Sequence, residues 1–498
     1  MELLRRDGEP SRRALRVVGA LASAAAGLLA VRFLAIAVGL MAVRVPYPFE
    51  LEWMEGGSLA HVLRLLAGDA IYAEPSAAWV PFIYHPLYYV VAAPLVAAFG
   101  VGLPPLRLVS ALSSVATGAL LGRLAWRETR SPWAGVVAPG LYAATFPLQG
   151  GWLDIARADS LALALIVGGT LAVREARSAR GMLWAGVLLY LAMMTKQTTA
   201  WVAMPGVAFA VWRDGPRGLA LALGVAAAML ATMGLFAATS DGWYLYYCFE
   251  LPRSHTLIAR MWGAYWTEDL APLGIALFAA VALPFLWLRR PRGRAGHGLV
   301  AAFVVGTLVA GYHARLHSGN YINVLQIPFA GLALALAVVA FRPARIQGRT
   351  LSVVLAAAAA VQLVLLDFDP RRHRPPPEAW DQGRAVLRVL AEAPRPLYAP
   401  ELMSYTLLLG APPAPHAVAV EDVLRGEPEE PKARYLSSVA RAARAGEYGA
   451  IVLGSRSIAG STVRVWRLGY RYRRALEGPS TLTGMGTYPR RILERREP

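Results

Sequence analysis

Three things that soluble proteins use freely are scarce in this sequence: charged residues, lysine and cysteine. Charged residues make up 16% of the 498 positions, against about 25% in soluble domains, while hydrophobic residues make up 56%. This scarcity of charge excludes an ordinary soluble globular protein and indicates a polytopic membrane protein. The single cysteine, Cys248, excludes an internal disulfide and a cysteine-based zinc site.

The charge that is present is mostly of one sign and comes almost entirely from arginine. The formal net charge is +18, and Lys196 and Lys432 are the only lysines. The arginines stand in short clusters between apolar runs, which argues against a nucleic-acid partner. No glycine-rich GxGxxG motif follows a strand-like segment, so nucleotide binding is not indicated either.

Eleven apolar runs are candidates for crossing the membrane, which takes about 20 apolar residues in a helix. They cover residues 15–43, 104–123, 132–149, 159–174, 182–195, 198–212, 218–239, 270–288, 298–312, 321–341 and 350–367. The first run begins after a group of arginines and is longer than the core of a signal peptide, so we interpret it as an uncleaved anchor.

The topology depends on the apolar segment at 86–101, because every later loop changes side if this segment crosses the membrane. If it does not cross, the segments on one side hold 20 basic residues and those on the other hold 8, although the latter are longer. Basic residues concentrate on the cytoplasmic side of membrane proteins. We therefore predict eleven spans, a cytoplasmic N-terminus over 1–14, and a juxtamembrane or re-entrant helix at 86–101 on the outer side.

The last part of the chain differs from the rest in composition. A proline-rich break, RRHRPPPEAW, ends the last span. Beyond it, helix-like stretches (EAWDQGRAVLRVLAEA, ARYLSSVARAARAG) alternate with strand-like ones (RPLYAP, GAIVLGS). This pattern predicts an all-α transmembrane domain over 15–369, with a large outer loop at 44–103, followed by a small extracytoplasmic α/β domain over 370–498.

The most unusual polar stretch is ELEWMEGG in the outer loop, because it gathers Glu50, Glu52 and Glu55 in an acid-poor region. Glu52 and Glu55 are three residues apart and would share one face of a helix. Two carboxylates at the membrane boundary could serve as a general base or bind a metal ion. The alternative is the solvated start of a helix, but Phe49 and Trp53 make the surroundings apolar and idle charge costly.

A second group of charges, LDIARADS, holds Asp154, Arg157 and Asp159. The spacing allows an Asp154–Arg157 ion pair and a helix cap at Asp159 or Ser160. In the alternative interpretation, Arg157 faces a phosphate group and Asp159 holds it in place. Both interpretations stay open on these residues alone.

Two further outer segments carry cations. HARLHSGNY offers Arg315 and His317, which suit an anionic group at the membrane surface, and His317 is a weaker candidate for a metal ligand. MTKQTT places Lys196 in a short outer turn, where it either contacts a phosphate or extends to the lipid–water interface. Ordinary solvated loops are the alternative for both segments.

These features together predict carboxylates and phosphate-binding cations around one cavity at the outer membrane surface. Such a cavity suits group transfer from a lipid phosphate: a carboxylate removes the proton of an acceptor hydroxyl, and cations stabilise the leaving phosphate. A lipid-anchored donor needs no nucleotide-binding loop, in agreement with the sequence.

Several of these stretches resemble motifs of GT-C glycosyltransferases, and more narrowly the branch with aminoarabinose transferases, protein mannosyltransferases and RgtA/B/C/D-like proteins. EWMEGGSLAHVLRLLAGDAIY and YHPLYYVVAAPLVAAFG are similar to the family's first outer loop, with its acidic pair near DEGYY and its KPPLYY segment. LDIARADSLAL is similar to the second outer motif, and MTKQTT to LTKG or LTKQ. The resemblance covers roughly 15–370.

The resemblance implies an acidic base in the first outer loop, an outer C-terminal domain and a polyprenyl-phosphate-linked sugar as donor. Met54 stands where the family has its first acid, and Glu55 stands at the second. The expected base is therefore Glu52, supplied from one turn earlier, with Glu55 as the second candidate and Glu50 as the third.

The same resemblance, with the charges described above, assigns the donor phosphate to Arg157, Arg315 and Lys196. His85 stands where the family often has a phosphate-contacting lysine and is the fourth candidate. Asp154, Asp159 and His317 are expected to support these groups. No set of metal ligands is predicted, although the clustered glutamates permit a divalent ion.

The sequence thus predicts a plasma-membrane (inner-membrane) glycosyltransferase that acts on an envelope glycan, lipid or protein at the outer face of the bilayer. Two other classes of protein stay open. A multi-pass transporter of an envelope precursor would show charges within its spans and an inverted repeat, and we find no such repeat. A non-catalytic envelope assembly protein would retain the fold, and the departures at Met54 and His85 keep that interpretation open.

Overall fold

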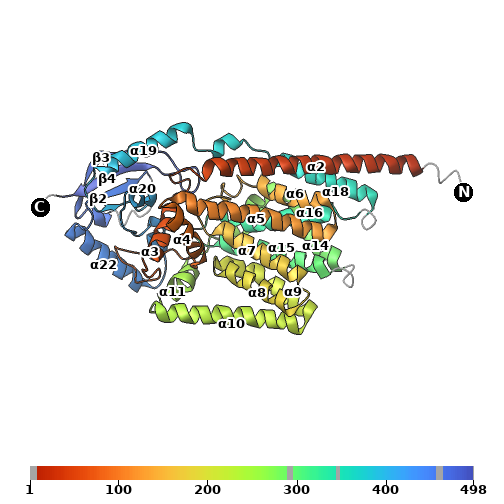
Figure 1. The fold of residues 1–498 in the computed structure, drawn as a ribbon, viewed down its shortest axis with the longest axis horizontal. Helices are drawn as coiled ribbons and strands as arrows, with labels where there is room; N and C mark the ends of the chain where they lie inside the picture. Colours follow the sequence, from red (N-terminus) through yellow and green to blue (C-terminus); the bar gives the residue numbers. More distant parts are fainter. Residues whose placement is uncertain (1–7, 289–294, 344–347, 456–463, 497–498) are drawn as a thin grey trace.

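The computed structural model describes residues 8–288, 295–343, 348–455 and 464–496. The molecule is elongated, with a bundle of roughly parallel helices towards its N-terminal end and a small sheet with its own helices at the C-terminal end (Figure 1). In this view α2 runs along one side of the bundle and α10 along the other.

Each of the eleven apolar runs contains one helix of the bundle. These helices are α2 (Gly8–Arg44), α5 (Leu103–Thr129), α6 (Pro132–Ala144), α7 (Asp159–Glu175), α8 (Ala179–Met193), α9 (Ala200–Asp214), α10 (Pro216–Thr239), α14 (Gly274–Leu288), α15 (Ala295–Leu316), α16 (Gln326–Ala340) and α18 (Arg349–Leu365). Helix α16 is buried along its whole length, as a helix that is apolar on every side should be. Helix α2 begins at Gly8, so the predicted N-terminal segment 1–14 is already partly helical.

Five of the described helices are individually long and apolar enough to cross a membrane, and seven spans result if two bent helix pairs count as one span each. The chain is therefore a multi-pass membrane protein by helix length and composition. The shorter helices fall below this limit: α6, with 13 residues, is about 20 Å long at 1.5 Å per residue. The number of eleven spans and the sides of the two termini stay predictions.

The outer loop forms two helices, α3 (Glu55–Leu66) and α4 (Leu87–Phe99), which lie between the bundle and the sheet (Figure 1). Helix α4 is the segment on which the predicted topology depends. It has 13 residues and contains Pro94, so it is shorter than the about 20 residues that a span needs. This length agrees with a juxtamembrane helix.

Short helical turns make up the remaining connections. Between α10 and α14 lie α11 (Trp243–Leu245), the π-helix η2 (Tyr246–Glu250), α12 (Leu251–Ser254), α13 (Met261–Ala264), the π-helix η3 (Tyr265–Asp269) and the 3₁₀ turn η4 (Ala271–Leu273). Three other 3₁₀ turns are η1 (Gln197–Thr199), η6 (Ile322–Leu325) and η7 (Pro370–His373).

The C-terminal part contains a four-stranded mixed sheet in the order β1-β2-β4-β3. The strands are β1 (Leu397–Tyr398), β2 (Ala450–Gly454), β3 (Tyr470–Ala475) and β4 (Pro489–Arg495), and the helices are α19 (Pro377–Ala391), α20 (Met403–Leu408), α21 (Ala417–Arg425) and α22 (Glu429–Ala445). Strands β1 and β2 are parallel, with Leu397 paired to Ala450, while β4 is antiparallel to both its neighbours. The two predicted strands and two predicted helices are present; β3 and β4 were not predicted.

The apolar cores show how the C-terminal part joins the rest. One core fills the bundle. Two others combine outer-loop residues with C-terminal ones: Tyr47 and Phe49 pack with Leu397 and Val452, and Leu59 packs in the core that also holds Val420. The sheet and its helices are therefore seated on the outer loop, and the interface between them contains polar groups as well.

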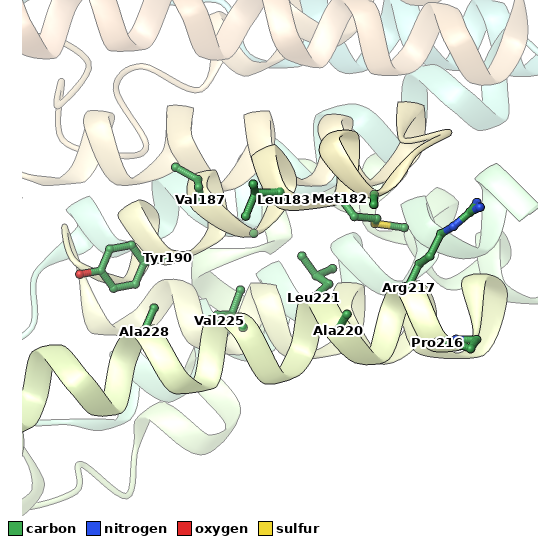
Figure 2. A pocket seen from close by; sticks show the side chains of 13 residues that line it. Met182, Leu183, Val187, Tyr190, Pro216, Arg217, Ala220, Leu221, Val225 and Ala228 are labelled. Carbon is green, nitrogen blue, oxygen red and sulfur yellow. The ribbon is translucent and has the colours of Figure 1, made fainter.

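An apolar groove lies between α8 and α10. It has a volume of about 420 Å³, and Figure 2 shows Met182, Leu183, Leu221 and Val225 facing one another across it. No carboxylate lines this α8–α10 groove.

Candidate functional site

A polar cavity, also of about 420 Å³, lies where the C-terminal part meets the outer loop and the ends of the bundle helices. Its walls come from parts of the chain that are far apart in sequence: the turn before α3, the segment before α7, the loop before η6, helix α21 and the segment before β4. Its charged and amide side chains are Glu52, Arg157, Asn320, Asn323, Glu421, Asp422 and Arg425.

Glu52 is the acid of the predicted trio that lines this polar cavity. Its side chain is fully buried, and one carboxylate oxygen, Oε2, accepts a hydrogen bond from the backbone N–H of Met54 at 3.1 Å. The other oxygen, Oε1, is buried without a hydrogen-bond partner in the described part of the chain. Burial raises the pKa of Glu52 to about 8, although the charge of Arg157 acts to lower it.

Arg157 is the cation of the polar cavity that lies beside Glu52. Its Nη1 is 3.4 Å from Oε2 of Glu52 and 2.7 Å from the sulfur of Met54, while Nη2 donates to the hydroxyl of Tyr84 at 2.9 Å. The guanidinium also lies 5.3 Å from the ring centre of Tyr84 and 6.0 Å from that of Trp152. The aromatic faces hold the cation in place and leave it facing the polar cavity.

Glu55 has a different environment from Glu52, although both are buried. The two carboxylate oxygens of Glu55 form a bidentate ion pair with Arg107 and accept backbone N–H groups of Leu51 at 2.7 Å and Ala156 at 2.9 Å. These contacts outweigh burial, which acts to raise the pKa of Glu55, so that the pKa lies below its ordinary value. Glu55 does not line the polar cavity.

Arg107 organises the turn that carries the acids, which we call the acid turn (residues 44–55). Besides Glu55, its guanidinium donates to three backbone carbonyls, those of Arg44, Tyr47 and Phe49. All five N–H groups of the guanidinium are thereby used. Arg107 was not singled out from the sequence; the available signal was its position in the first turns of α5, among apolar residues.

The expectation that Glu52 and Glu55 share one face of a helix is wrong. Helix α3 begins at Glu55, and Glu52 lies in the turn before it. The Glu55 carboxylate folds back to accept the N–H groups of Leu51 and Glu52, and this fixes the turn. The two acids therefore point to different partners.

Glu50 lies on the other side of the acid turn, against the C-terminal part. Its Oε1 accepts the backbone N–H of Ser404 at 2.9 Å, and its Oε2 is buried without a partner among the described residues. Burial raises the pKa of Glu50 to about 8. Glu50 does not line the polar cavity.

The two glycines of ELEWMEGG are required by close packing. A Cβ on Gly56 would lie 2.5 Å from both Oε1 of Glu50 and the nitrogen of Ser404, and one on Gly57 would lie 2.3 Å from the ring of Phe82. Both positions are tighter than a side chain allows. The start of α3 therefore packs directly on the C-terminal part.

Asp154 is paired with Arg44, a residue far from it in sequence. Of the two interpretations of LDIARADS, the Asp154–Arg157 ion pair is not formed: the Asp154 carboxylate accepts Nε of Arg44 at 2.9 Å, and both side chains are fully buried. Arg44 also donates to the carbonyls of Gly151 and His373. Asp154 thus fixes the end of α2 to the segment before α7.

The helix cap at Asp159 or Ser160, which belonged to the same interpretation, is not formed either. Asp159 is the first residue of α7, whose N-cap residue is Ala158, and it forms no cap. Its carboxylate binds Nζ of Lys196 at 2.5 Å and Nδ2 of Asn323 at 2.9 Å. Lys196 lies 5.8 Å from the ring centre of Tyr84, so Lys196 and Arg157 both contact this ring.

Three other predicted residues lie outside the polar cavity. His85 is buried with Nδ1 2.8 Å from the hydroxyl of Tyr244, and burial lowers its pKa to about 4, so it is neutral at pH 7. Arg315 forms an ion pair with Asp269 at 2.6 Å. His317 stacks near His313, at 4.8 Å between ring centres, and burial lowers its pKa as well.

Helix α21 supplies the wall that the sequence did not indicate. Asp422 accepts Nη2 of Arg425 at 3.1 Å and lies 3.9 Å from Nε2 of His255. Burial raises the pKa of Asp422 to about 6. Nearby, His416 places Nε2 2.9 Å from the carbonyl oxygen of Trp53, so α21 also contacts the acid turn.

No group of three or more potential metal-binding His, Cys, Asp or Glu side chains occurs among the described residues. The polar cavity brings one acid, Glu52, next to a cation. Its walls can hold an anionic group at Arg157 and place a proton acceptor beside it.

No protein-family model matches the sequence, and neither does any curated protein. Among solved structures, ArnT from Cupriavidus metallidurans bound to undecaprenyl phosphate is similar, with a TM-score of 0.55 and 15% identity over 93% of this chain and 97% of that one. The apo form of the same protein gives a TM-score of 0.50 at 15% identity over the same shares. An oligosaccharyltransferase from Archaeoglobus fulgidus, complexed with zinc and sulfate, gives a lower TM-score of 0.49 at 12% identity over 93% of this chain and 73% of that one.

Proposed function

We propose that this chain, which has the fold of the GT-C superfamily, is a glycosyltransferase that moves a sugar from a polyprenyl phosphate to an acceptor hydroxyl. The observation that carries the proposal is the pairing of Glu52 with Arg157 in the polar cavity. Oε1 of Glu52 is buried and unpartnered among the described residues, and an arginine that suits a phosphate lies beside it.

Glu52 acts as the general base in this reaction. The acceptor hydroxyl gives its proton to the Glu52 carboxylate, and the acceptor oxygen attacks the anomeric carbon of the donor sugar. The bond from that carbon to the phosphate oxygen breaks, and the polyprenyl phosphate leaves with the electron pair. A pKa near 8 makes the Glu52 carboxylate a stronger base than an ordinary glutamate.

Arg157 stabilises the charge that develops on the leaving phosphate. Its contact with Glu52 is loose, at 3.4 Å, so a phosphate oxygen can compete for the same guanidinium. Lys196 adds positive charge next to the ring of Tyr84. Its ammonium group pairs with the carboxylate of Asp159, which also accepts a hydrogen bond from Asn323. His85 and Arg315 are not part of this phosphate site.

Glu55 and Arg107 keep the base in position. Because the Glu55 carboxylate accepts the backbone N–H groups of Leu51 and Glu52, loss of its charge would release the turn that carries Glu52. Glu50 fastens the same turn to Ser404. The three acids therefore divide into one base and two positioning residues.

The donor class is supported by the fold, since the similar ArnT structure contains undecaprenyl phosphate. The acceptor is an envelope molecule at the outer face of the plasma membrane, which follows from the predicted topology. Helix α21 forms the wall opposite the acid turn, so Glu421 and Asp422 are the residues that would contact an acceptor hydroxyl.

The proposal is tested by mass spectrometry of the lipids that co-purify with three forms of the protein. We expect wild type to retain polyprenyl phosphate, Glu52→Gln to retain the intact polyprenyl-phosphate sugar, and Arg157→Ala to retain neither. Glu378→Gln, an exposed acid on α19, is the matched control and should resemble wild type. Bulk phospholipid alone in all forms would contradict the donor assignment.

A further inference from the structure

A strongly basic cavity lies on the sheet, away from the polar cavity. Its volume is about 690 Å³, and it is lined by Arg467, Arg471, Arg490, Arg491 and Arg496, with Glu477 as the one acid among the lining residues that the structure describes. We call it the arginine cavity. All five arginines are exposed.

The charge of the arginine cavity is not a consequence of overall composition. Almost every cation of this chain is an arginine, so the residue type alone carries no information. On helix α22, however, cations and acids pair along the helix, as Lys432 does with Glu429 and Arg434 with Glu430. In the part of the chain that the structure describes, the side chains of Arg467, Arg490 and Arg491 form no ion pair or hydrogen bond.

Protection of a sheet edge does not account for it either. Charged side chains on an edge strand prevent pairing with other chains, and this explains arginines on β3, which is at the edge. Arg490 and Arg491 belong to β4, which lies between β2 and β3 and has both edges paired. Their charge therefore needs another reason.

We propose that the arginine cavity binds a polyanionic polymer of the cell envelope, a chain of repeated phosphate or carboxylate groups. The cations come from before β3, from β3, from β4 and from after β4, and all five line one cavity with a volume of about 690 Å³, which has room for more than one anionic group. Tyr472, which is 58% exposed, adds an aromatic surface to the same cavity. Guanidinium groups bind phosphate and carboxylate in bidentate fashion.

The position of the sheet favours a polymer over the headgroups of the protein's own membrane. Strands β3 and β4 lie at the end of the molecule farthest from the N-terminus, beyond α3 and α4 (Figure 1). A site on these strands lies apart from the bundle, and the predicted topology puts it outside the membrane, in the cell envelope. The inference is independent of the proposed transfer reaction.

The test uses the full chain in nanodiscs of phosphatidylcholine, with inorganic polyphosphate as the probe. We expect polyphosphate to bind wild type, and Arg490→Gln/Arg491→Gln to weaken binding at least tenfold. The slope of log affinity against log salt should fall by about two, one for each arginine removed. Arg441→Gln/Arg444→Gln removes two exposed arginines of α22 and should leave affinity within about twofold of wild type.

Equal weakening by both double variants would show general charge attraction and overturn the site. So would failure of wild type to bind polyphosphate at low salt. Wild type that binds anionic vesicles as tightly as polyphosphate would assign the surface to lipid and overturn the polymer. Unchanged melting temperatures establish that the variants fold. If Arg490→Gln/Arg491→Gln disturbs the sheet, the test uses Arg467→Gln, which changes one arginine of the cavity outside the strands and should also weaken binding.

Discussion

Two cavities of this molecule have the same volume, about 420 Å³, and opposite chemistry. The α8–α10 groove is lined by aliphatic side chains, with Arg217 as its charged residue (Figure 2). The polar cavity holds Glu52, Arg157 and Asp422, whose side chains are buried. Removing a charged group from water costs free energy that ion pairs and hydrogen bonds must offset. Size therefore does not identify the site, whereas buried charge does.

The walls of the two cavities also differ in origin. The α8–α10 groove is made by one continuous stretch, residues 179–228, and any apolar side chain serves there. The polar cavity needs the acid turn, α21 and Gly484 together. A substitution in the α8–α10 groove should be accommodated by the neighbouring side chains, whereas a substitution in the polar cavity should change the rate of transfer.

The largest expected effect is that of Glu52→Gln. Because the amide cannot accept the acceptor's proton, transfer should fall by about 10²–10⁴-fold, the usual contribution of a general base. The measurement is transfer from a polyprenyl-phosphate sugar by the purified protein, with correct insertion checked by chromatography. Transfer at the wild-type rate would remove Glu52 as the base.

Glu55→Gln should lower stability and, because Glu55 holds the turn that carries Glu52, should lower transfer with it. The substitution leaves the Arg107 charge buried without its carboxylate partner, which costs about 3–5 kcal/mol in unfolding free energy. Thermal unfolding of the detergent-solubilised protein measures this, and Glu378→Gln is the exposed control. Unchanged stability with lost transfer would reassign the base to Glu55.

The rate of transfer should depend on pH through Glu52. A base acts when deprotonated, and burial raises the pKa of Glu52 to about 8, so the rate should rise with pH and level off above about 8. The expected slope is about tenfold per pH unit below that value. Glu50→Gln removes another glutamate whose pKa burial raises to about 8, and it should leave the midpoint of the profile unchanged. A profile that is flat from about pH 6 to 9 would contradict the assignment.

The smallest effect comes from a matched pair of glycines, one in each cavity. A Cβ on Gly484 would lie 2.8 Å from Oε1 of Glu52, at a φ of +75°, so Gly484→Ala should cost about 1–2 kcal/mol and lower transfer. Gly224 lies in the α8–α10 groove with nothing within 4 Å of an added Cβ. Gly224→Ala should leave transfer unchanged and raise stability by about 0.5–1 kcal/mol. Equal effects would remove the distinction between the cavities.

The fold was largely predictable because its helices are apolar runs and its first two strands are short apolar segments between turns. Strands β3 and β4 were missed because their sequences, YRYRRA and PRRILER, are rich in arginine and have few buried residues. Tertiary pairing, not local pattern, makes them strands.

The site was predictable as a set of residues but not as a set of partners. Glu52 and Arg157 were expected, and they meet although they are 105 residues apart. The sequence allowed Asp154 to pair with a residue three positions away, but its partner Arg44 lies 110 residues away. Spacing along a helix gives only local neighbours, and the contacts of a buried charge are set by whichever opposite charge the fold brings in.

The seating of the C-terminal part on the acid turn has a consequence for synthesis of the protein. The carbonyl of Leu51 receives the N–H groups of Leu482 and Thr483, and the next residues, Gly484 and Met485, complete the polar cavity. The acid turn is therefore synthesised long before the residues that complete the cavity around it. A ribosome that stops after the last bundle helix would leave Glu52 without the wall formed by Gly484 and Met485, and the polar cavity would form only after these residues are made.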